Sequence, residues 1–159
     1  MELETRPEHA ELVRRAYDAF RAETRAAPPL TLRGGSAVDA YETPEPYDAE
    51  LDAPTADYLE RHRWGIAHLD AASWRHYLPR LIEHALAHFA RPTSVATESF
   101  LFALRAPDRD PPRHGSLTPE QERAVADFLE ALAYGEGSAW SDDALVALEE
   151  WWGPDPLYR

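Results

Sequence analysis

The stretch from Ala71 to Arg91, AASWRHYLPRLIEHALAHFAR, constrains the fold more than any other part of the chain. Its apolar residues recur at steps of three and four, the spacing that gathers side chains on one face of an α-helix. They are Trp74, Tyr77, Leu78, Leu81, Ile82, Ala85, Leu86 and Phe89. The spacing predicts a long helix after a cap at Asp70. Because Pro79 lacks an amide hydrogen, we expect a kink or a break there.

Periodicity and helix-end signals predict further helices at about residues 6–25, 36–41, 56–64, 119–134 and 142–152. Residues 95–104 can form a helix or a short buried strand, and we favour the helix. The Gly34-Gly35 pair is interpreted as a turn, and Gly65 as a helix stop. Residues 42–55 read as a surface connection anchored by Tyr47 and Leu51. The sequence therefore predicts one all-α domain over residues 1–159, a bundle-like arrangement of five to seven helices around the proline-containing one.

Capping-box spacing, in which Ser, Thr or a similar residue precedes an acid or amide by three positions, occurs at several of these helix starts. The pairs are Thr5 with Glu8, Ser36 with Asp39, and Thr118 with Gln121. Each pair predicts the start of a helix.

Composition excludes several kinds of protein. The chain has no cysteine, which excludes disulfides, cysteine-bound zinc, iron–sulfur clusters and cysteine nucleophiles. No apolar run reaches the roughly 18–20 residues that cross a bilayer, and the N-terminal residues lack a signal-peptide core. We therefore expect a soluble cytoplasmic protein with no membrane partner. All 16 basic residues are Arg, without Lys or Asn, which is typical of a GC-rich bacterial genome.

The formal charge of −13, from 29 acids and 16 bases, bears on the choice of partner. Nucleic-acid binding needs a positive field, so the charge argues against it, whereas an acidic surface suits a basic protein. Residues 39–60 mix tyrosines with acids, and their spacing does not match a calcium-binding EF-hand loop. The predicted partner-binding residues are Tyr41, Glu45, Tyr47, Asp48, Glu50 and Asp52. The alternative is an acidic surface that only keeps the protein in solution.

His84 and His88 stand four residues apart, which directs two imidazoles to the same side of a helix and can supply two ligands to zinc. His76 lies two turns away and cannot complete such a site. A third ligand must come from another element, with His114 or an acid from residues 39–60 as candidates. The HExxH order of metalloproteases is absent. The alternative is a structural role at the edge of the buried face, with no cofactor.

Other polar residues suggest weaker sites. The segment that holds His62, His68 and His76 could form a His–Asp or His–Glu relay, but no Gly-x-Ser-x-Gly turn presents a nucleophile. Ser73 is interpreted as the N3 residue of the helix capped by Asp70, so no catalytic residue is predicted. The five tryptophans fit either a core or interface anchors. The loop from Arg105 to Arg113 is interpreted as a solvated connection, with anion binding by Arg105, Arg109 or Arg113 as the alternative.

The segments WGIAHLDAASWRHYLP and SLTPEQERAVADFLEAL resemble a family of uncharacterised small bacterial proteins. The matching positions are Trp74, Tyr77, Leu78, Pro79 and Leu117 through Gln121, and the resemblance covers roughly residues 50–135. It implies a domain of unknown function and names no site.

These features lead to three hypotheses. The first is a non-enzymatic protein-binding domain, such as an adaptor or an immunity or inhibitor protein directed at a basic toxin or nuclease. The second is a metal-dependent hydrolase in which His84 and His88 bind zinc and Glu83 or a distant acid acts as base. The third is a plain structural subunit.

Overall fold

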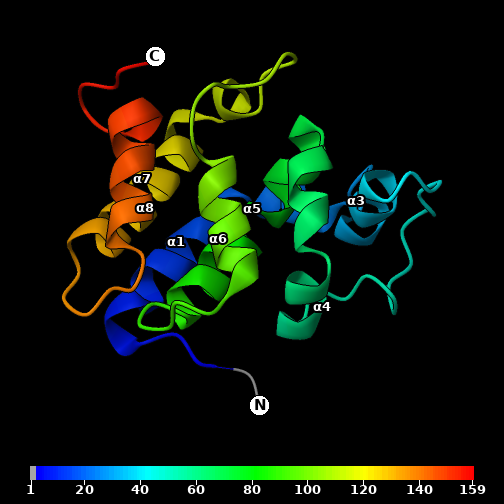
Figure 1. The fold of residues 1–159 in the computed structure, drawn as a ribbon, viewed down its shortest axis with the longest axis horizontal. Helices are drawn as coiled ribbons and strands as arrows, with labels where there is room; N and C mark the ends of the chain where they lie inside the picture. Colours follow the sequence, from blue (N-terminus) through cyan, green and yellow to red (C-terminus); the bar gives the residue numbers. More distant parts are fainter. Residues whose placement is uncertain (1–2) are drawn as a thin grey trace.

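The helix predicted around Pro79 is the central element of the structure, a computed structural model that describes residues 3–159. This helix, α5 (Ala71–Ala87), buries the predicted apolar face and continues through Pro79 without a break. Proline leaves the carbonyl of Arg75 without its usual donor four residues on. Helices α1 (Ala10–Ala19), α2 (Arg21–Arg25), α6 (Val95–Ala103) and α7 (Pro119–Tyr134) all contact α5 (Figure 1).

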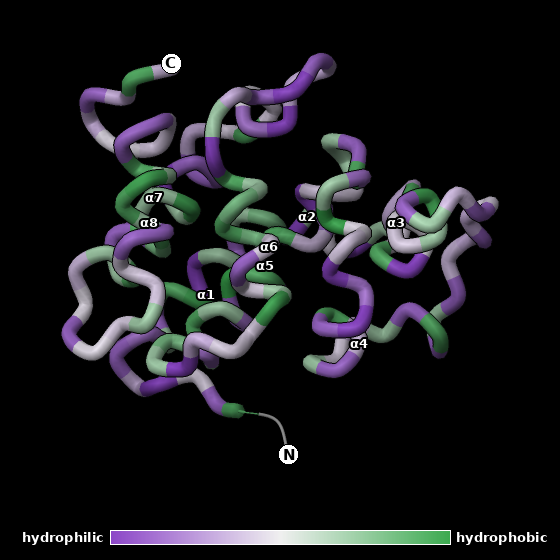
Figure 2. Tube along the Cα trace, in the orientation of Figure 1, coloured by the Kyte–Doolittle hydropathy of each residue, from purple (hydrophilic) through white to green (hydrophobic). Residues whose placement is uncertain are grey.

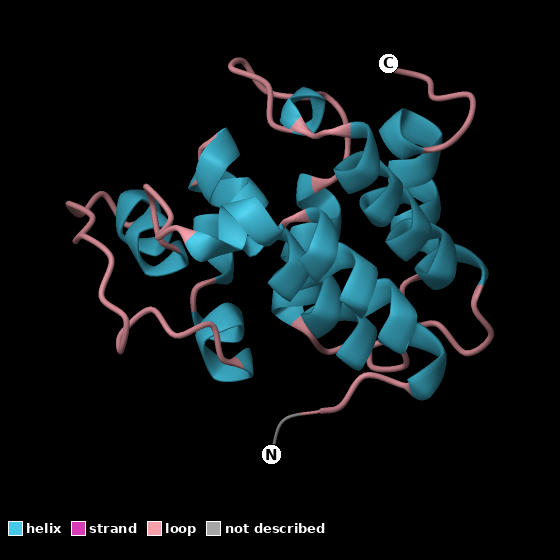
Figure 3. Cartoon of the chain, turned by 180° about the vertical axis from the view of Figure 1, so that it is seen from behind, coloured by secondary structure: helices cyan, strands magenta, loops and turns pink. Residues whose placement is uncertain are grey.

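The described residues form helices and loops without a strand (Figure 3), so the all-α prediction and the helical choice for residues 95–104 are confirmed. The other α-helices are α3 (Leu32–Asp39), α4 (Ala56–Arg61) and α8 (Ser141–Ala147). Short 3-10 segments occur at η1 (Pro7–His9), η2 (Arg63–His68) and η3 (His114–Ser116), and a π-helical turn at η4 (Leu148–Trp152).

The expected number of five to seven helices is too low for the described residues, which contain eight α-helices besides the short segments. The predicted helix at residues 6–25 is interrupted at Phe20, where the backbone turns to φ −108° and ψ 20°. The predicted helix at 56–64 is interrupted in the same way at His62. Apolar spacing continues across such interruptions, so periodicity alone does not reveal them.

The capping predictions have different outcomes. Thr118 and Gln121 form the predicted capping box at the start of α7. Thr5 and Glu8 do not form one, because the chain enters a 3-10 turn at Pro7 and its N-cap, Arg6, makes no side-chain cap. Ser36 does not start a helix either. Helix α3 already begins at Leu32, where the Thr31 hydroxyl accepts a hydrogen bond from the Gly34 amide at 2.8 Å.

The interpretation of Gly34-Gly35 as a turn is wrong, because both residues lie inside α3. Gly65 likewise lies inside η2 and stops no helix. These two elements touch through backbone atoms: a methyl group on Gly35 would lie 2.6 Å from the Gly65 carbonyl oxygen, and one on Gly65 would lie 2.2 Å from that of Leu32. Glycine is therefore used here for close approach and not for chain reversal.

The hydrophobic core surrounds α5 and continues between α6, α7 and α8, where hydrophobic stretches gather in Figure 2. Trp74, Trp140 and Trp152 are buried, and the indole N–H groups of Trp140 and Trp152 donate to the carbonyls of His88 and Leu104. Trp64 is 56% exposed, so the tryptophans divide between core and surface. The described chain begins at the bottom of Figure 1 and ends at its top left. Among residues 3–159, no helix is long and apolar enough to cross a membrane.

Substituting Gly35→Ala should destabilise the protein by about 2–3 kcal/mol, because the added methyl group meets backbone atoms of Gly65 that have no room to move. Gly137→Ala is the control. Gly137 has φ +84° and no atom would lie within 4 Å of an added methyl group, so only the left-handed backbone should cost, about 1 kcal/mol. Urea unfolding of both variants measures the difference, and equal losses would contradict the close-contact explanation.

Candidate functional site

The predicted partner-binding residues lie on one long connection between α3 and α4, called here the acidic loop (residues 40–55). The loop extends from the body beside α3 (Figures 1 and 3) and is mostly hydrophilic (Figure 2). The predicted anchors Tyr47 and Leu51 do not hold it, since their side chains are 46% and 57% exposed.

Asp52 anchors the acidic loop instead. Its carboxylate accepts hydrogen bonds from the Arg33 guanidinium (3.1 and 2.9 Å), the Tyr58 hydroxyl (2.7 Å) and the Asp48 amide (2.9 Å). Burial acts to raise the pKa of Asp52, but these donors outweigh it and hold the pKa below the ordinary value. Asp52 is 3% exposed, so the prediction that it contacts a partner is corrected: it shapes the surface that a partner would meet.

The other five predicted residues, Tyr41, Glu45, Tyr47, Asp48 and Glu50, are all exposed. Two of them also organise the loop. Glu45 pairs with Arg33 at 3.1 Å, and the Asp48 carboxylate accepts hydrogen bonds from the amides of Glu50 and Leu51. The loop therefore presents its acids and tyrosines from a defined backbone.

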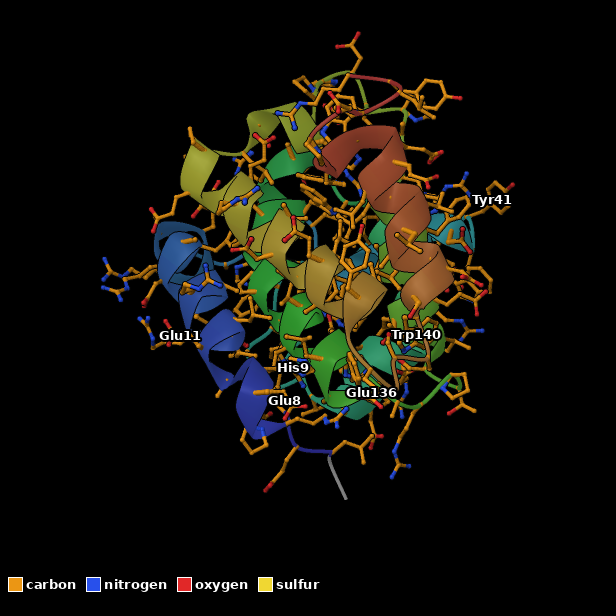
Figure 4. All side chains as sticks on the ribbon, turned by 90° about the vertical axis from the view of Figure 1, so that its left-hand side faces the viewer. Glu8, His9, Glu11, Tyr41, Glu136 and Trp140 are labelled. Atoms are coloured by element: carbon orange, nitrogen blue, oxygen red, sulfur yellow. The ribbon has the colours of Figure 1, made fainter. Side chains whose placement is uncertain are left out.

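Tyr41 has the most unusual conformation on this surface. It follows α3 at the position where a Schellman motif places its left-handed residue, with the Glu42 amide bonding the Ala37 carbonyl at 2.7 Å. Glycine is usual there, yet Tyr41 adopts φ +61°, the one positive φ of a non-glycine residue among residues 3–159. Its side chain is 99% exposed and points away from the ribbon (Figure 4). A strained backbone thus holds an aromatic ring entirely in solvent.

His84 and His88 also meet the third ligand type that the sequence required. Glu60, from the end of α4, lies beside them, and one ligand atom from each of the three residues lies within 4.8 Å of the others. We call these three residues the histidine–glutamate cluster. The sequence limited the third ligand to a range that ends at residue 60 but could not single out Glu60, because the turn between α4 and α5 sets its position. His114, the other candidate, lies elsewhere, against Trp74 and Trp152.

Hydrogen bonds already order this cluster. The Glu60 carboxylate accepts from His84 Nε2 at 2.5 Å, from the Ser94 hydroxyl at 2.7 Å and from the Ala96 amide at 3.1 Å. His88 Nδ1 donates to the His84 carbonyl at 2.8 Å, which directs its Nε2 lone pair outward when the ring is neutral. Glu60 thereby links α4, α5 and the first turn of α6.

The protonation states of His84 and Glu60 suit both a hydrogen-bonded link between helices and a metal site. Burial lowers the pKa of His84 despite its contact with Glu60, so the ring is neutral at pH 7. Burial acts to raise the pKa of Glu60, but its donors, Ser94 first, hold the pKa below the ordinary value. Neutral imidazole and ionised carboxylate are the forms that bind a metal ion.

The residues fit zinc in kind and need adjustment in geometry. Tetrahedral zinc with bonds of about 2.1 Å separates its ligand atoms by about 3.4 Å. The 2.5 Å contact between His84 and Glu60 must therefore open, and His84 must release its Nε2 proton. His84 and His88 also line a groove of about 700 Å³, together with Thr55, Arg80 and Glu83 among others.

The remaining polar candidates take structural positions. The Ser73 side chain is buried and its hydroxyl accepts the Leu30 amide at 2.8 Å, so it is not presented as a nucleophile. Tyr77, one turn further on, accepts the Leu32 amide at 3.2 Å. His76 pairs with the carbonyl of Glu23 at 3.0 Å.

The chain is thus an all-helical domain with an anchored acidic loop and a histidine–glutamate cluster. It belongs to a family of unknown function (DUF6714), whose pattern matches residues 8–155. The predicted family relationship is confirmed, and the match is wider than the expected residues 50–135, since it includes α1 and Trp151-Trp152. Neither the curated proteins nor the solved structures contain a match to the chain.

Stability should fall as the pH drops from 7.5 to 5.5. Burial is the largest influence on His9, His62, His84 and His114, and it lowers the pKa of each below the ordinary 6.5. The unfolded chain then binds more protons than the folded one below pH 6.5, so acidification favours unfolding, while the contribution is complete above that pH. Urea unfolding at the two pH values measures the change. Constant stability across this interval would contradict the neutral buried state of these rings.

Proposed function

We propose that this chain is a non-enzymatic protein-binding domain whose acidic loop engages a basic protein. Tyr41 carries the proposal. A tyrosine in the left-handed conformation costs about 1 kcal/mol relative to glycine. Because the Tyr41 ring is exposed, its contacts with the described residues do not offset this cost. Strain of this kind is concentrated at functional positions. Tyrosine is also a frequent anchor of binding energy at interfaces.

Charge defines the kind of partner. Beyond Tyr41, the acidic loop carries three exposed carboxylates and a second exposed ring, from Glu45, Asp48, Glu50 and Tyr47. The chain as a whole has a net charge of −13. Such a surface attracts a basic protein over a distance and repels nucleic acid. An adaptor, or an immunity or inhibitor protein directed at a basic toxin or nuclease, belongs to this class. We place its action in the bacterial cytoplasm.

Tyr41→Gly separates binding from folding. Glycine removes the backbone strain, so the variant should be more stable than the wild type by about 0.5–1 kcal/mol while it loses the aromatic anchor. Partners are recovered on immobilised wild-type protein from a lysate of the source cells, purified and titrated by calorimetry. We expect Tyr41→Gly to lower the affinity for the recovered basic protein at least tenfold.

Tyr134→Ala is the matched control, because Tyr134 is 72% exposed on α7, away from the acidic loop. It should leave the affinity unchanged. A triple variant, Glu45→Gln, Asp48→Asn and Glu50→Gln, should weaken binding and reduce its dependence on salt. Binding that resists both 300 mM salt and the triple substitution would refute the role of the acidic loop.

A second candidate function is metal-dependent hydrolysis, favoured by the proximity of Glu60, His84 and His88 at the edge of a groove. Two histidines and a glutamate are a donor set used by zinc hydrolases. Glu83, one of the two predicted choices for the base beside a distant acid, lines the same groove. Its carboxylate accepts a hydrogen bond from the Tyr17 hydroxyl at 2.8 Å and pairs with Arg80 at 3.3 Å. It would have to leave these partners to take a proton.

Elemental analysis tests this candidate. Protein purified without chelators, loaded with zinc and desalted should retain about one equivalent of metal. His88→Ala should lose the metal with little loss of stability, because His88 lies at the half-buried edge of the cluster. His76→Ala, on the same helix outside the cluster, should retain it. No retained metal in the wild type would leave the cluster as a hydrogen-bonded link between α4, α5 and α6.

A further inference from the structure

Unpartnered polar atoms gather at one place in the core. Six buried side-chain nitrogen or oxygen atoms of residues 3–159 have no hydrogen-bond partner within the protein. Four belong to a single group of side chains: Trp74 Nε1, Arg113 Nε, His114 Nδ1 and Trp151 Nε1. The His114 ring contacts the rings of Trp74 and Trp151, with centroids 5.3 and 5.4 Å apart, and Arg113 lies over Trp74 at 5.0 Å. Native proteins leave few such atoms without partners, so a concentration of four indicates a polar site.

Arg113 is the charge in this group. Its side chain is 2% exposed, and its Nη1 donates to the carbonyls of Ile66 and Leu69, each at 3.3 Å. No carboxylate of the described chain forms an ion pair with it, although the other acids and arginines form many such pairs. Burial lowers the pKa of Arg113 to about 9, so the guanidinium remains charged at pH 7. A buried cation without an anion is costly, and an anionic ligand would offset that cost.

A cavity adjoins this charge. It has a volume of about 1010 Å³, and Arg113 and His114 form part of its lining. Its walls include Trp64 and Phe102, which are 56% and 71% exposed, together with Ile66 and Leu101. Volume and lining resemble those of small-molecule pockets, in which apolar walls surround a few polar groups.

The other charged groups of the cavity are arranged unequally. Arg63 lies over Trp64, and Arg105 is held by Glu150. Among the acids, the Asp108 carboxylate is occupied by the amides of residues 109, 113, 114 and 115. Asp142 and Asp143 lie in the first turn of α8, where the helix dipole compensates their charge. Glu98 lies at the first turn of α6. Arg113 is therefore a buried cation without a directly paired carboxylate, since Asp108 and Asp70 act on it only at longer range.

We propose that this cavity binds a small organic anion, with its oxyanion group directed at Arg113 and its apolar body against Trp64 and Phe102. The predicted alternative for the Arg105–Arg113 loop, anion binding, is thereby placed on Arg113. The proposal is independent of the acidic loop and of the histidine–glutamate cluster, since it shares no residue with either. It assigns the protein a ligand as well as a partner.

Phenylacetate and phenylacetamide form a matched pair of probes, because they share a shape and differ in charge. The full-length protein labelled with ¹⁵N is titrated with each, and the five indole N–H signals are assigned with Trp→Phe variants. Phenylacetate should shift the signals of Trp64, which lines the cavity, and of Trp74, which lies beneath Arg113, along one saturable curve, with at least tenfold higher affinity than phenylacetamide. The signals of Trp140 and Trp152, already bonded to carbonyls, serve as internal controls and should move less. Phenyl phosphate in parallel distinguishes a phosphate from a carboxylate ligand.

Two substitutions locate the site. Phe102→Ala, at an exposed wall of the cavity, should lower the affinity for phenylacetate at least fivefold without unfolding the protein. Tyr134→Ala should leave this affinity unchanged. Arg113→Gln should abolish the preference for phenylacetate over phenylacetamide, provided that circular dichroism shows this variant to be folded. If Arg113→Gln does not fold, the affinity of Phe102→Ala for phenylacetate tests the site. Equal affinity for the two probes would overturn the anionic assignment. No saturable shift up to 50 mM would overturn the site itself.

Discussion

The burial of α5 is the constraint on which the rest of the structure depends. A helix surrounded by other helices leaves few polar side chains without a partner, because an unpaired buried group costs more than a hydrogen bond contributes. Ser73 and Tyr77 therefore accept the amides of Leu30 and Leu32, which fixes the entry to α3. His84 bonds Glu60, which fixes the end of α4 against α6. The polar groups of the central helix thus decide where the outer helices lie.

The acidic loop inherits its position from these contacts. Helix α3 is held by α5 at its start and by the glycine contact with η2 along its length, so Arg33 is presented at a fixed place. Arg33 and Tyr58 then hold the buried carboxylate of Asp52. A loop rich in acids and proline is commonly mobile, but one buried, hydrogen-bonded carboxylate is enough to give it a defined shape. Tyr41 is presented at the beginning of the loop because α3 ends there.

The two segments on which the predicted family resemblance rests have mainly structural roles in this chain. The Tyr77 hydroxyl accepts a hydrogen bond from the Leu32 amide at the start of α3, and Trp74 is buried beneath Arg113. Gln121 completes the capping box of α7 and also donates to the Ala19 carbonyl and the Glu23 carboxylate, which links α7 to α1 and α2. A motif that looks like a simple helix cap therefore also joins helices distant in sequence. The residues proposed to bind a metal ion or a ligand, such as Glu60 and Arg113, lie outside these segments.

The sequence by itself determined the helical class, the central helix and its buried face, and the capped start of α7, because these follow from local spacing and local hydrogen bonds. It also identified the spacing of His84 and His88 and the exposed acids of the acidic loop. Only the tertiary structure decided that Gly35 serves contact and not a turn, that Asp52 is buried, that Glu60 is the third member of the cluster, and that Arg113 is buried without a directly paired carboxylate. Each of these depends on which residues from distant parts of the chain meet. Apolar spacing specifies the face that is buried and leaves open what it is buried against.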